Sequence, residues 1–360
     1  MSTLMVMAGG TGGHVYPAMA VADALHAEGW NIVWLATEGG MENRLITGKP
    51  YLVEMIRMRG VRGKGLATRL LSPFQVAAAC LKSLVALRRR RPDVVLGMGG
   101  FAALPGGLVA WLTRRPLVIH EQNSIAGLTN RVLSHVASRV LAAFPSAFGE
   151  RATLVGNPVR AEIAAVDLPE QRFAGREGVL RVAVVGGSLG AQALNETVPA
   201  ALALMPADAR PQVIHQAGEK HIDRLRANYA GAGVAAETRA FIDDMAGLYA
   251  WSDVVICRAG ALTVAELSAA GVASVLVPFP HAVDDHQTGN ARYLADHGAA
   301  VLVQQRDLDP QMLAGLLGGF TRETLCRMAQ RARGLGKPQA TAAVAAVCRQ
   351  LAKNREGGDM

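Results

Sequence analysis

The sequence predicts an α/β protein of two domains, each built around a parallel sheet. Short β-rich runs alternate with helical patterns, which is typical of parallel strands joined by right-handed crossovers. The alternation stops at a polar, proline-bearing stretch between Gly156 and Gly175 and then starts again. The chain has 360 residues, which is long enough for two separate cores. We expect domains at residues 1–160 and 161–338, and a helix at 339–360 that returns to the first domain.

Each strand is expected from a short apolar, β-branched run and each helix from a longer amphipathic one. The first half has strands at Thr3–Ala8, Asn31–Ala36, Val94–Met98, Leu117–His120, Arg139–Ala142 and Ala152–Val155, with helices at Pro17–Glu28, Pro73–Arg90, Gly106–Thr113 and Gly127–Ala137. The second half has strands at Leu180–Val185, Gln212–His215, Thr238–Phe241, Val254–Cys257, Ser274–Val277 and Ala300–Val303, and a final helix at Ala340–Lys353.

The positive charge of the chain belongs to its first half. Residues 1–160 contain 18 Lys and Arg against 8 Asp and Glu, whereas the remaining residues contain 19 against 21. Such asymmetry predicts an anionic partner for the first domain, such as a membrane surface or a phosphorylated substrate. Nucleic acid is not expected, because the basic residues alternate with leucines rather than with stacking aromatics.

Other classes of protein are excluded by simple patterns. The 4 cysteines lack C-x-x-C spacing, so we expect a reducing cytoplasm and neither disulfides nor a zinc site. The N-terminus lacks the basic region of a signal peptide. The uncharged run Val94–Thr113 contains five glycines and a proline, so we read it as strand, loop and helix rather than as a membrane span.

A basic segment at residues 59–71 is expected to form a loop, followed by a helix that Ser72 and Pro73 begin. Leucines flanked by cations suit docking on anionic lipid. The residues expected to make that contact are Arg62, Lys64, Leu66, Arg69, Leu70 and Leu71. The helix itself is expected to turn one apolar face to the core, formed by Phe74, Ala77, Leu81, Leu84 and Val85.

Three glycine-rich turns follow apolar strands, at residues 9–13, 97–100 and 186–190. A strand, a glycine turn and a helix N-terminus together form a cradle for an anion such as a phosphate. The first turn does not fit G-x-G-x-x-G, since Val15 occupies the third glycine position, and no Walker A motif is present. A purely structural turn is the alternative, but His14 at the helix mouth is placed to take a proton beside a bound phosphate.

The segment from Cys257 to Glu266 is the most specific signal in the second half. A strand leads into Ala-Gly-Ala, and a helix is expected to begin at Thr263, with N–H groups that can cradle a diphosphate. Glu266 lies one turn into that helix, where a carboxylate can accept both hydroxyls of a ribose. The alternative reading is an ordinary helix start that resembles a capping box.

Two polar loops follow further strands. Residues 120–123 stand at a strand end, where open parallel sheets bind ligands. The loop from Pro278 carries Gln287 and Asn290, which can read sugar hydroxyls. The acidic pairs at residues 243–244, 284–285 and 307–309 could suggest Mg²⁺. Asp307 and Asp309 precede Pro310 and an expected helix, so helix capping is the better reading there, and no metal site is expected.

Taken together, these motifs resemble the MurG family of bacterial N-acetylglucosaminyltransferases. The resemblance spans almost the whole chain and rests on the order and spacing of residues 9–14, 97–100, 120–123, 156–160, 186–191 and 258–263. It implies a GT-B fold, in which two Rossmann-like, doubly wound domains face each other across a cleft. It also implies transfer of N-acetylglucosamine from UDP-N-acetylglucosamine to lipid I, giving lipid II for peptidoglycan synthesis.

The resemblance also implies roles for individual residues. Thr11, Gly12 and Gly13 would lie near the donor sugar and phosphate, with Asn123 on the sugar. Arg160 and Ile242 would contact the uracil, and Ser188 the diphosphate. Gln287 would contact sugar hydroxyls. The diphosphate and ribose would lie along Ala261, Leu262, Thr263, Val264, Ala265 and Glu266.

The chemistry of an inverting transfer agrees with these assignments. His14 is the first choice for the base that activates the acceptor hydroxyl, and Glu121 is the second. Glycine cradles and helix N-termini can neutralise the departing UDP without a metal. We therefore expect no cofactor and no protein-held metal site, although stimulation by a metal stays open. The expected location is the cytoplasmic face of the inner membrane, as a peripheral protein.

Three other readings remain open at this point. A sugar-nucleotide epimerase would share the architecture but would need no basic, apolar surface and no acceptor. A transferase could act on another lipid acceptor, such as diacylglycerol. A non-catalytic nucleotide-sugar-binding scaffold is a third reading, although pure binding requires no candidate base.

Overall fold

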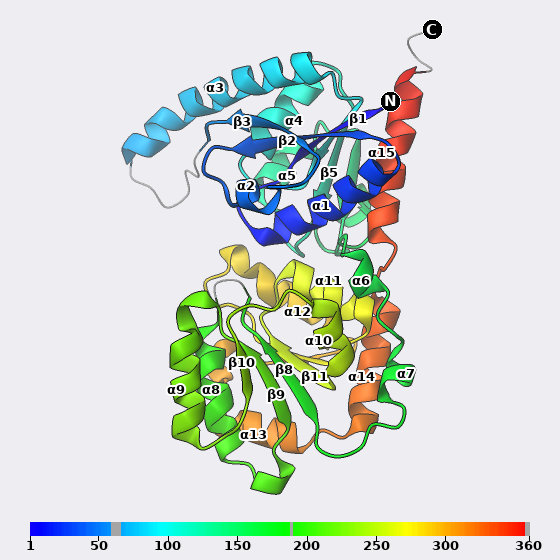
Figure 1. Cartoon of the computed structure of the whole chain (residues 1–360). Coiled ribbons are helices and arrows are strands. Elements are labelled where there is room, and N and C mark those ends of the chain that lie inside the picture. The colour runs from blue at the N-terminus through cyan, green and yellow to red at the C-terminus, as the bar shows by residue number, and fades with distance from the viewer. Residues whose placement is uncertain (59–65, 188–189, 357–360) are drawn as a thin grey trace. The chain divides into compact units, whose positions relative to one another are not determined.

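The computed structural model describes residues 1–58, 66–187 and 190–356. The chain divides into two compact units (Figure 1). Unit 1 comprises Met1–Arg160 and Pro338–Met360, and unit 2 comprises Ala161–Lys337. Each unit has its own parallel sheet and its own hydrophobic core.

The sheet of unit 1 has seven strands in the order β3-β2-β1-β4-β5-β6-β7. The strands are β1 (Thr3–Met7), β2 (Asn31–Thr37), β3 (Leu52–Ile56), β4 (Val94–Gly97), β5 (Leu117–Glu121), β6 (Arg139–Ala142) and β7 (Thr153–Leu154). The helices are α1 (Gly12–Ala27), α2 (Met41–Leu45), α3 (Leu66–Arg90), α4 (Ala103–Leu112), α5 (Leu128–Leu133) and α15 (Ala340–Glu356). The order reverses between β1 and β4, which makes that boundary the topological switch point of the sheet.

Helices cover both faces of this sheet, because alternate residues of each strand point to opposite sides. In β1, Leu4 and Val6 pack in a core with α1, whereas Met5 and Met7 pack in a second core with α3, α4 and α5. Helix α15 belongs to the first of these cores, to which it contributes Val344, Ala345, Cys348, Leu351 and Ala352. It lies beside α1 (Figure 1).

Unit 2 has a six-stranded parallel sheet in the order β10-β9-β8-β11-β12-β13, with its switch point between β8 and β11. The strands are β8 (Arg181–Val185), β9 (Gln212–Gln216), β10 (Glu237–Arg239), β11 (Val254–Cys257), β12 (Ser274–Leu276) and β13 (Val301–Leu302). The helices are α6 (Ala161–Ala164), α7 (Pro169–Phe173), α8 (Gln192–Ala203), α9 (Ile222–Ala232), α10 (Met245–Trp251), α11 (Ala261–Ala270), α12 (His286–Ala295), α13 (Pro310–Gly318) and α14 (Arg322–Leu335).

Helix α3 differs from its prediction in two respects. It begins at Leu66 rather than at Pro73, because residues 66–71 are mostly strong helix formers. The apolar face assigned to the core is also wrong, since Phe74 and Leu81 are 75% and 64% exposed. The buried face of the helix is formed instead by Ala79, Ser83, Ala86 and Leu87, and the helix packs against α4.

Other boundaries also shifted. Strand β3 was not predicted, and it lies at the sheet edge with Leu52, Val53 and Met55 exposed. The uncharged run at residues 94–113 is β4, a loop and α4, as predicted. No helix in the described part of the chain has both the length and the apolar character needed to cross a membrane.

Candidate functional site

Two glycine loops meet at the switch point of unit 1. One follows β1 and the other follows β4, the two strands between which the order reverses. Gly100 has φ +88, and a Cβ atom there would overlap the carbonyl oxygen of Gly9. Only glycine permits so close an approach of the two loops, at the position where open parallel sheets bind ligands.

The N-terminus of α1 directly follows the first of these loops. Within the described loop, the N-cap residue Thr11 makes no side-chain capping hydrogen bond to the helix. The backbone N–H groups of Gly12 and Gly13 precede the first intrahelical bonds, so they can bind an anion with help from the helix dipole. The geometry therefore suits the predicted placement of Thr11, Gly12 and Gly13 beside a phosphate.

His14 is held against both loops. Its Nδ1 atom donates to the carbonyl oxygen of Gly9 at 3.1 Å. Its ring also lies against Gly99, where an added Cβ would be 3.2 Å from Nε2. A carbonyl oxygen can only accept, so the neutral ring carries its proton on Nδ1 and its lone pair on Nε2. In that tautomer Nε2 is the ring atom that can accept a proton.

A buried acid beneath the first glycine loop was missed by the sequence reasoning. Glu42 is fully buried and accepts from the backbone N–H of Thr37 at 2.8 Å and from that of Gly10 at 3.4 Å. The Thr37 hydroxyl donates to the same carboxylate. Glu42 therefore helps to fix the conformation of the glycine loop. It lies in a short helix 32 residues after Gly10, and nothing in the sequence links the two positions.

The loop after β5 is organised by Glu121. This buried carboxylate accepts from the backbone N–H groups of Asn123 at 3.0 Å and Gly127 at 3.1 Å, and from the Asn130 amide at 2.9 Å. These contacts favour a supporting role for Glu121, which holds Asn123 in place, over the role of second-choice base. Burial lowers the pKa of the neighbouring His120 to about 4, and its Nε2 donates to the Gly156 carbonyl at 2.8 Å.

Several predicted residues of unit 1 lie elsewhere or outside the described residues. Arg160 is partly buried at the last position of the first segment of unit 1. Arg62 and Lys64 lie outside the described residues. Leu66, Arg69, Leu70 and Leu71 belong to α3, whose first eight side chains are likewise not described.

Unit 2 repeats this arrangement at its own switch point. The third glycine loop follows β8, and the predicted diphosphate segment follows β11, the adjacent strand in the sheet. The Gln216 side chain brackets this loop, accepting from Gly187 N at 3.1 Å and donating to Gly187 O at 3.0 Å. Gln216 was not singled out in the sequence, and Ser188 lies outside the described residues.

Helix α11 presents its N-terminus at this switch point. It begins at Ala261 rather than at Thr263, with Gly260 as the N-cap. The first intrahelical bond runs from Val264 N to Gly260 O at 2.9 Å, so the N–H groups of Ala261, Leu262 and Thr263 precede it. A glycine N-cap has no side chain to cap these donors, which leaves the helix end suited to an anion.

Glu266 lies one turn into α11, as predicted, and is 5% exposed. Its Oε2 atom accepts from the hydroxyl of Tyr249, a fully buried residue of α10, at 3.0 Å. Val264 is fully buried, so only its backbone can reach a ligand, and Ala265 is partly buried. The side chain of Ile242 is also mostly buried.

The loop between β12 and α12 is tied together by side chains. Gln287 accepts from Phe279 N at 2.9 Å, and the fully buried Asn290 donates to Ala259 O at 3.2 Å. This burial favours a supporting role for Asn290 over the direct sugar contact that the sequence suggested. Arg258 is half-buried, which lowers its pKa, and it donates to Gln305 at 2.7 Å and lies over the Phe279 ring.

Two residues of the acidic pairs cap helices. Asp244 caps α10 and Asp309 caps α13, each by accepting a backbone N–H. Among the described residues, no group of three or more His, Cys, Asp or Glu side chains is arranged to hold a metal ion.

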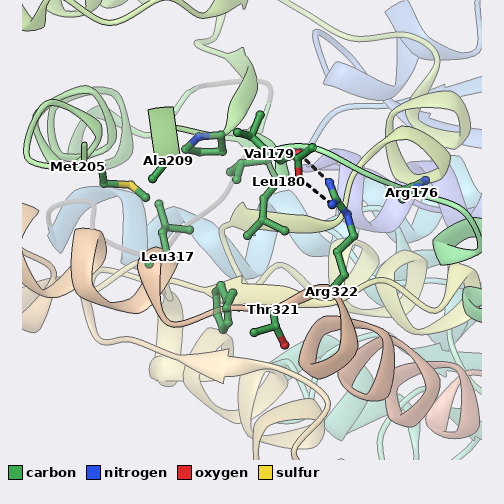
Figure 2. Close-up of a pocket in the computed structure, with 13 residues that line it drawn as sticks. Arg176, Val179, Leu180, Met205, Ala209, Leu317, Thr321 and Arg322 are labelled. Atoms are coloured by element: carbon green, nitrogen blue, oxygen red, sulfur yellow. Dashed lines mark hydrogen bonds between the residues drawn. The ribbon is translucent and has the colours of Figure 1, made fainter. Parts of the chain in front are cut away.

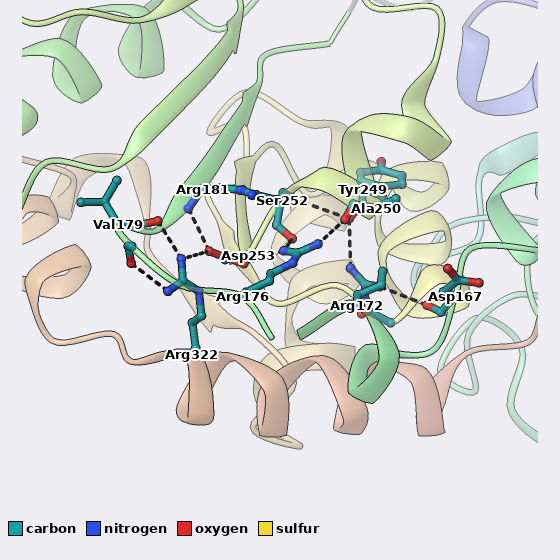
Figure 3. Close-up of polar contacts among 12 residues, drawn as sticks. Asp167, Arg172, Arg176, Val179, Arg181, Tyr249, Ala250, Ser252, Asp253 and Arg322 are labelled. Carbon is teal, nitrogen blue, oxygen red and sulfur yellow. Dashed lines mark hydrogen bonds and ion pairs between the residues drawn. The ribbon is translucent and has the colours of Figure 1, made fainter. Parts of the chain in front are cut away.

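A separate pocket of about 480 Å³ lies beside the first residues of β8, at the opposite end of that strand from the glycine loop (Figure 2). Its lining is mainly apolar, with Leu180, Met205 and Leu317 beside Arg176 and Arg322. Both arginines pair with the buried Asp253, Arg176 at 2.5 Å and Arg322 at 3.4 Å (Figure 3). The guanidinium groups at this end of the sheet therefore serve the packing of unit 2.

Comparison with known families decides the class. The model of the glycosyltransferase family 28 N-terminal domain matches residues 4–142, and that of the family 28 C-terminal domain matches residues 181–343. The chain belongs to glycosyltransferase family 28. The two matched ranges fall in unit 1 and mainly in unit 2, so each switch point described above lies within a family 28 domain.

Individual family 28 relatives agree with this assignment. The UDP-N-acetylglucosamine--N-acetylmuramyl-(pentapeptide) pyrophosphoryl-undecaprenol N-acetylglucosamine transferase of Burkholderia thailandensis is 59% identical over 360 residues, 99% of this chain and 98% of the relative. The crystal structure of Acinetobacter baumannii MurG superposes with a TM-score of 0.86 at 41% identity, covering 97% of this chain and 100% of that one. The resemblance to the MurG family and the GT-B fold class are thus confirmed.

A more distant structure shares only the fold. The UDP-GlcNAc 2-epimerase of Neisseria meningitidis, solved with UDP-GlcNAc, has a TM-score of 0.65 at 12% identity, covering 97% of this chain and 100% of that one. Its likeness explains why an epimerase fits the predicted architecture, whereas family membership places this chain with the glycosyltransferases.

Proposed function

We propose that this protein transfers N-acetylglucosamine from UDP-N-acetylglucosamine to the N-acetylmuramoyl-pentapeptide of undecaprenyl-pyrophosphate lipid I, forming lipid II. The observation that carries the proposal is the 59% identity, along the whole chain, to a transferase named for this reaction. The glycine loops and helix N-termini at both switch points give the chain the anion-binding groups that a UDP-sugar transferase needs.

The reaction is a direct displacement with inversion. The acceptor hydroxyl oxygen bonds to the anomeric carbon, while the bond from that carbon to the diphosphate oxygen breaks and its electron pair leaves with UDP. His14 takes the hydroxyl proton on Nε2, because Nδ1 is committed to the Gly9 carbonyl. General-base catalysis of this kind contributes about a hundredfold to ten-thousandfold.

Unit 2 supplies the donor site in this proposal. The N–H groups of Ala261, Leu262 and Thr263 bind the diphosphate and stabilise the charge that develops on UDP. Glu266 accepts the ribose hydroxyls. Ser188 at the third glycine loop and Ile242 near the uracil complete the nucleotide contacts, with Arg160 of unit 1 also assigned to the uracil.

The sugar is held by polar groups from two loops. Asn123, fixed by Glu121, and Gln287, tied to Phe279, are the side chains assigned to its hydroxyls. Thr11, Gly12 and Gly13 are assigned to the sugar and phosphate. No protein-held metal is assigned, because backbone N–H groups and helix dipoles supply the positive potential.

The acceptor carries a lipid, so we place the enzyme on the inner leaflet, at the cytoplasmic face of the membrane. The exposed apolar side chains Phe74, Leu81 and Val85 of α3, and Trp111 and Leu112 at the end of α4, support docking by unit 1. Helices α3 and α4 pack against each other, so these side chains lie on neighbouring elements. The net positive charge of residues 1–160 favours anionic lipid.

The test is sugar transfer from labelled UDP-N-acetylglucosamine to a short-chain lipid I analogue in the presence of EDTA. A new β-linked sugar on the analogue supports both the transferase and the absence of a required metal. Recovery of product only after Mg²⁺ is added would retain the transferase and refute the metal-free site. Release of free N-acetylmannosamine without any transfer would point instead to an epimerase.

A further inference from the structure

Tyr249 links two helices of unit 2 at the proposed ribose site. It belongs to α10, whereas Glu266 belongs to α11. Strand β11 separates the two helices along the chain. The Tyr249 ring is fully buried, and its hydroxyl donates to Glu266 Oε2 at 3.0 Å. A hydrogen bond to a carboxylate from a rigid aromatic side chain restricts the rotation of the carboxylate plane.

Tyr249 is itself held in place through its backbone. Arg172 of α7 donates from Nη1 to the Tyr249 carbonyl at 3.0 Å (Figure 3). Its Nη2 donates to the carbonyls of Ala270, at 3.3 Å, and Gly271. Ala270 is the last residue of α11, and Gly271 is its C-cap. One planar guanidinium therefore joins the backbone of α10 at Tyr249 to the C-terminal end of the helix that carries Glu266.

A second arginine of the same segment secures the end of α10. Arg176 donates to the carbonyls of Ala250 and Ser252 and pairs with the buried carboxylate of Asp253 at 2.5 Å. Arg172 is buried, and burial lowers its pKa to about 10, so it stays charged at neutral pH. The two helices are thus fixed to each other by groups that do not touch the ligand face of α11.

We propose that Tyr249 is a positioning residue for nucleotide recognition, which sets the orientation of the Glu266 carboxylate for the ribose diol, with Arg172 fixing the pair of helices. This inference rests on the proposed function, since it takes Glu266 as the group that accepts the ribose hydroxyls. One carboxylate accepts from two hydroxyls with good geometry only when both hydroxyls lie near its plane. Loss of the Tyr249 hydroxyl therefore weakens the reading of the ribose more than the binding of the diphosphate.

The experiment measures binding of UDP and of 2′-deoxy-UDP by calorimetry to the full chain and to Tyr249→Phe. The preference for UDP is the Kd of 2′-deoxy-UDP divided by the Kd of UDP. We expect this ratio to be about tenfold smaller in the variant, equivalent to one hydrogen bond of roughly 1.4 kcal/mol. Arg172→Lys, which keeps a cation but loses the planar fork, is expected to change the preference in the same direction. Thermal unfolding and transfer activity are recorded on the same samples.

Tyr229→Phe is the matched control. Tyr229 is also buried in unit 2, is 4% exposed, and its hydroxyl binds the ring of His215 at 2.9 Å. The substitution removes a hydroxyl from a comparable buried environment that does not include Glu266. The variant should therefore keep the preference of the unchanged protein for UDP over 2′-deoxy-UDP. If both variants lose thermal stability but only Tyr249→Phe loses the preference for UDP, the effect on ribose binding is distinct from the effect on stability.

The outcomes are distinct. If Tyr249→Phe weakens both ligands equally and keeps their ratio, the hydroxyl serves packing alone and the positioning role is refuted. If the unchanged protein transfers sugar but does not prefer UDP over 2′-deoxy-UDP, the transferase stands and this inference fails. If it neither transfers sugar nor binds UDP, the proposed function fails as well.

Discussion

The Nδ1 atom of His14 lies 3.1 Å from the carbonyl oxygen of Gly9. The contact sets the tautomer of the ring and assigns the lone pair to Nε2. We expect His14→Ala to lower kcat by about a hundredfold to ten-thousandfold while UDP affinity is retained, because the loss falls on the proton transfer. His26→Ala, at the other end of α1, is the control. Full turnover by His14→Ala would reject this residue as the base.

Glu42 joins the first glycine loop to the end of β2, since its two oxygens accept from the backbone N–H groups of Gly10 and Thr37. In Glu42→Gln, the amide would direct donors toward one of those N–H groups, which we expect to cost about 1–3 kcal/mol in the free energy of unfolding. We also expect the KM for UDP-N-acetylglucosamine to rise. Urea unfolding and steady-state kinetics measure these effects, with the exposed Glu38→Gln as the control. If the variant keeps the stability and the KM of the unchanged protein, Glu42 does not support the glycine loop.

The buried His120 makes the free energy of unfolding depend on pH. Its folded pKa is about 4, below the ordinary value of 6.5, because burial disfavours the charged ring. Between these values the unfolded chain binds a proton that the folded chain does not, so stability falls as the pH drops from 6.5 to 4. The slope from this residue is on the order of 1 kcal/mol per pH unit.

The corresponding variant is His120→Gln, which keeps a donor for the Gly156 carbonyl but does not titrate. We expect it to be less stable at pH 7, and its free energy of unfolding to fall less steeply between pH 6.5 and pH 4. Urea titrations at several pH values measure both slopes. Equal slopes in the two proteins would contradict a buried, neutral His120.

The exposed side chains of α3 offer a direct test of membrane docking. We expect the double change Phe74→Ser and Leu81→Ser to reduce co-flotation with phosphatidylglycerol vesicles by tenfold or more, since burial of one large apolar side chain is worth roughly 1.5–3 kcal/mol. UDP affinity should not change. Leu204→Ser, at an exposed leucine of unit 2, is the control. Equal partitioning of both variants would place the docking surface elsewhere.

The sequence predicted those parts of the fold that depend on local patterns. The apolar run of β11, Val254–Cys257, was assigned with its observed bounds because a buried central strand is apolar on both faces. The edge strand β3 was missed, since Glu54 interrupts its apolar run. The buried face of α3 was assigned wrongly because that helix carries apolar residues on both sides, and periodicity alone does not choose between them.

The candidate site shows the same division. Glycine turns and the Glu266 helix could be found from spacing, because each is a short segment of chain. Glu42, Gln216 and Tyr249 support those segments from positions 17 to 32 residues away. Such pairs are created by the fold, so a single sequence contains no signal for them.

Helix α15 supplies side chains to the core between α1 and the sheet of unit 1, yet it is synthesised after the whole of unit 2. Domains usually fold in the order in which they emerge from the ribosome. Here the order is reversed: unit 2 is continuous and can complete its core first, whereas unit 1 must wait for α15. Until then the core that α1 shares with the sheet lacks the side chains of α15, so the packing of unit 1 is completed only by residues that are made after unit 2.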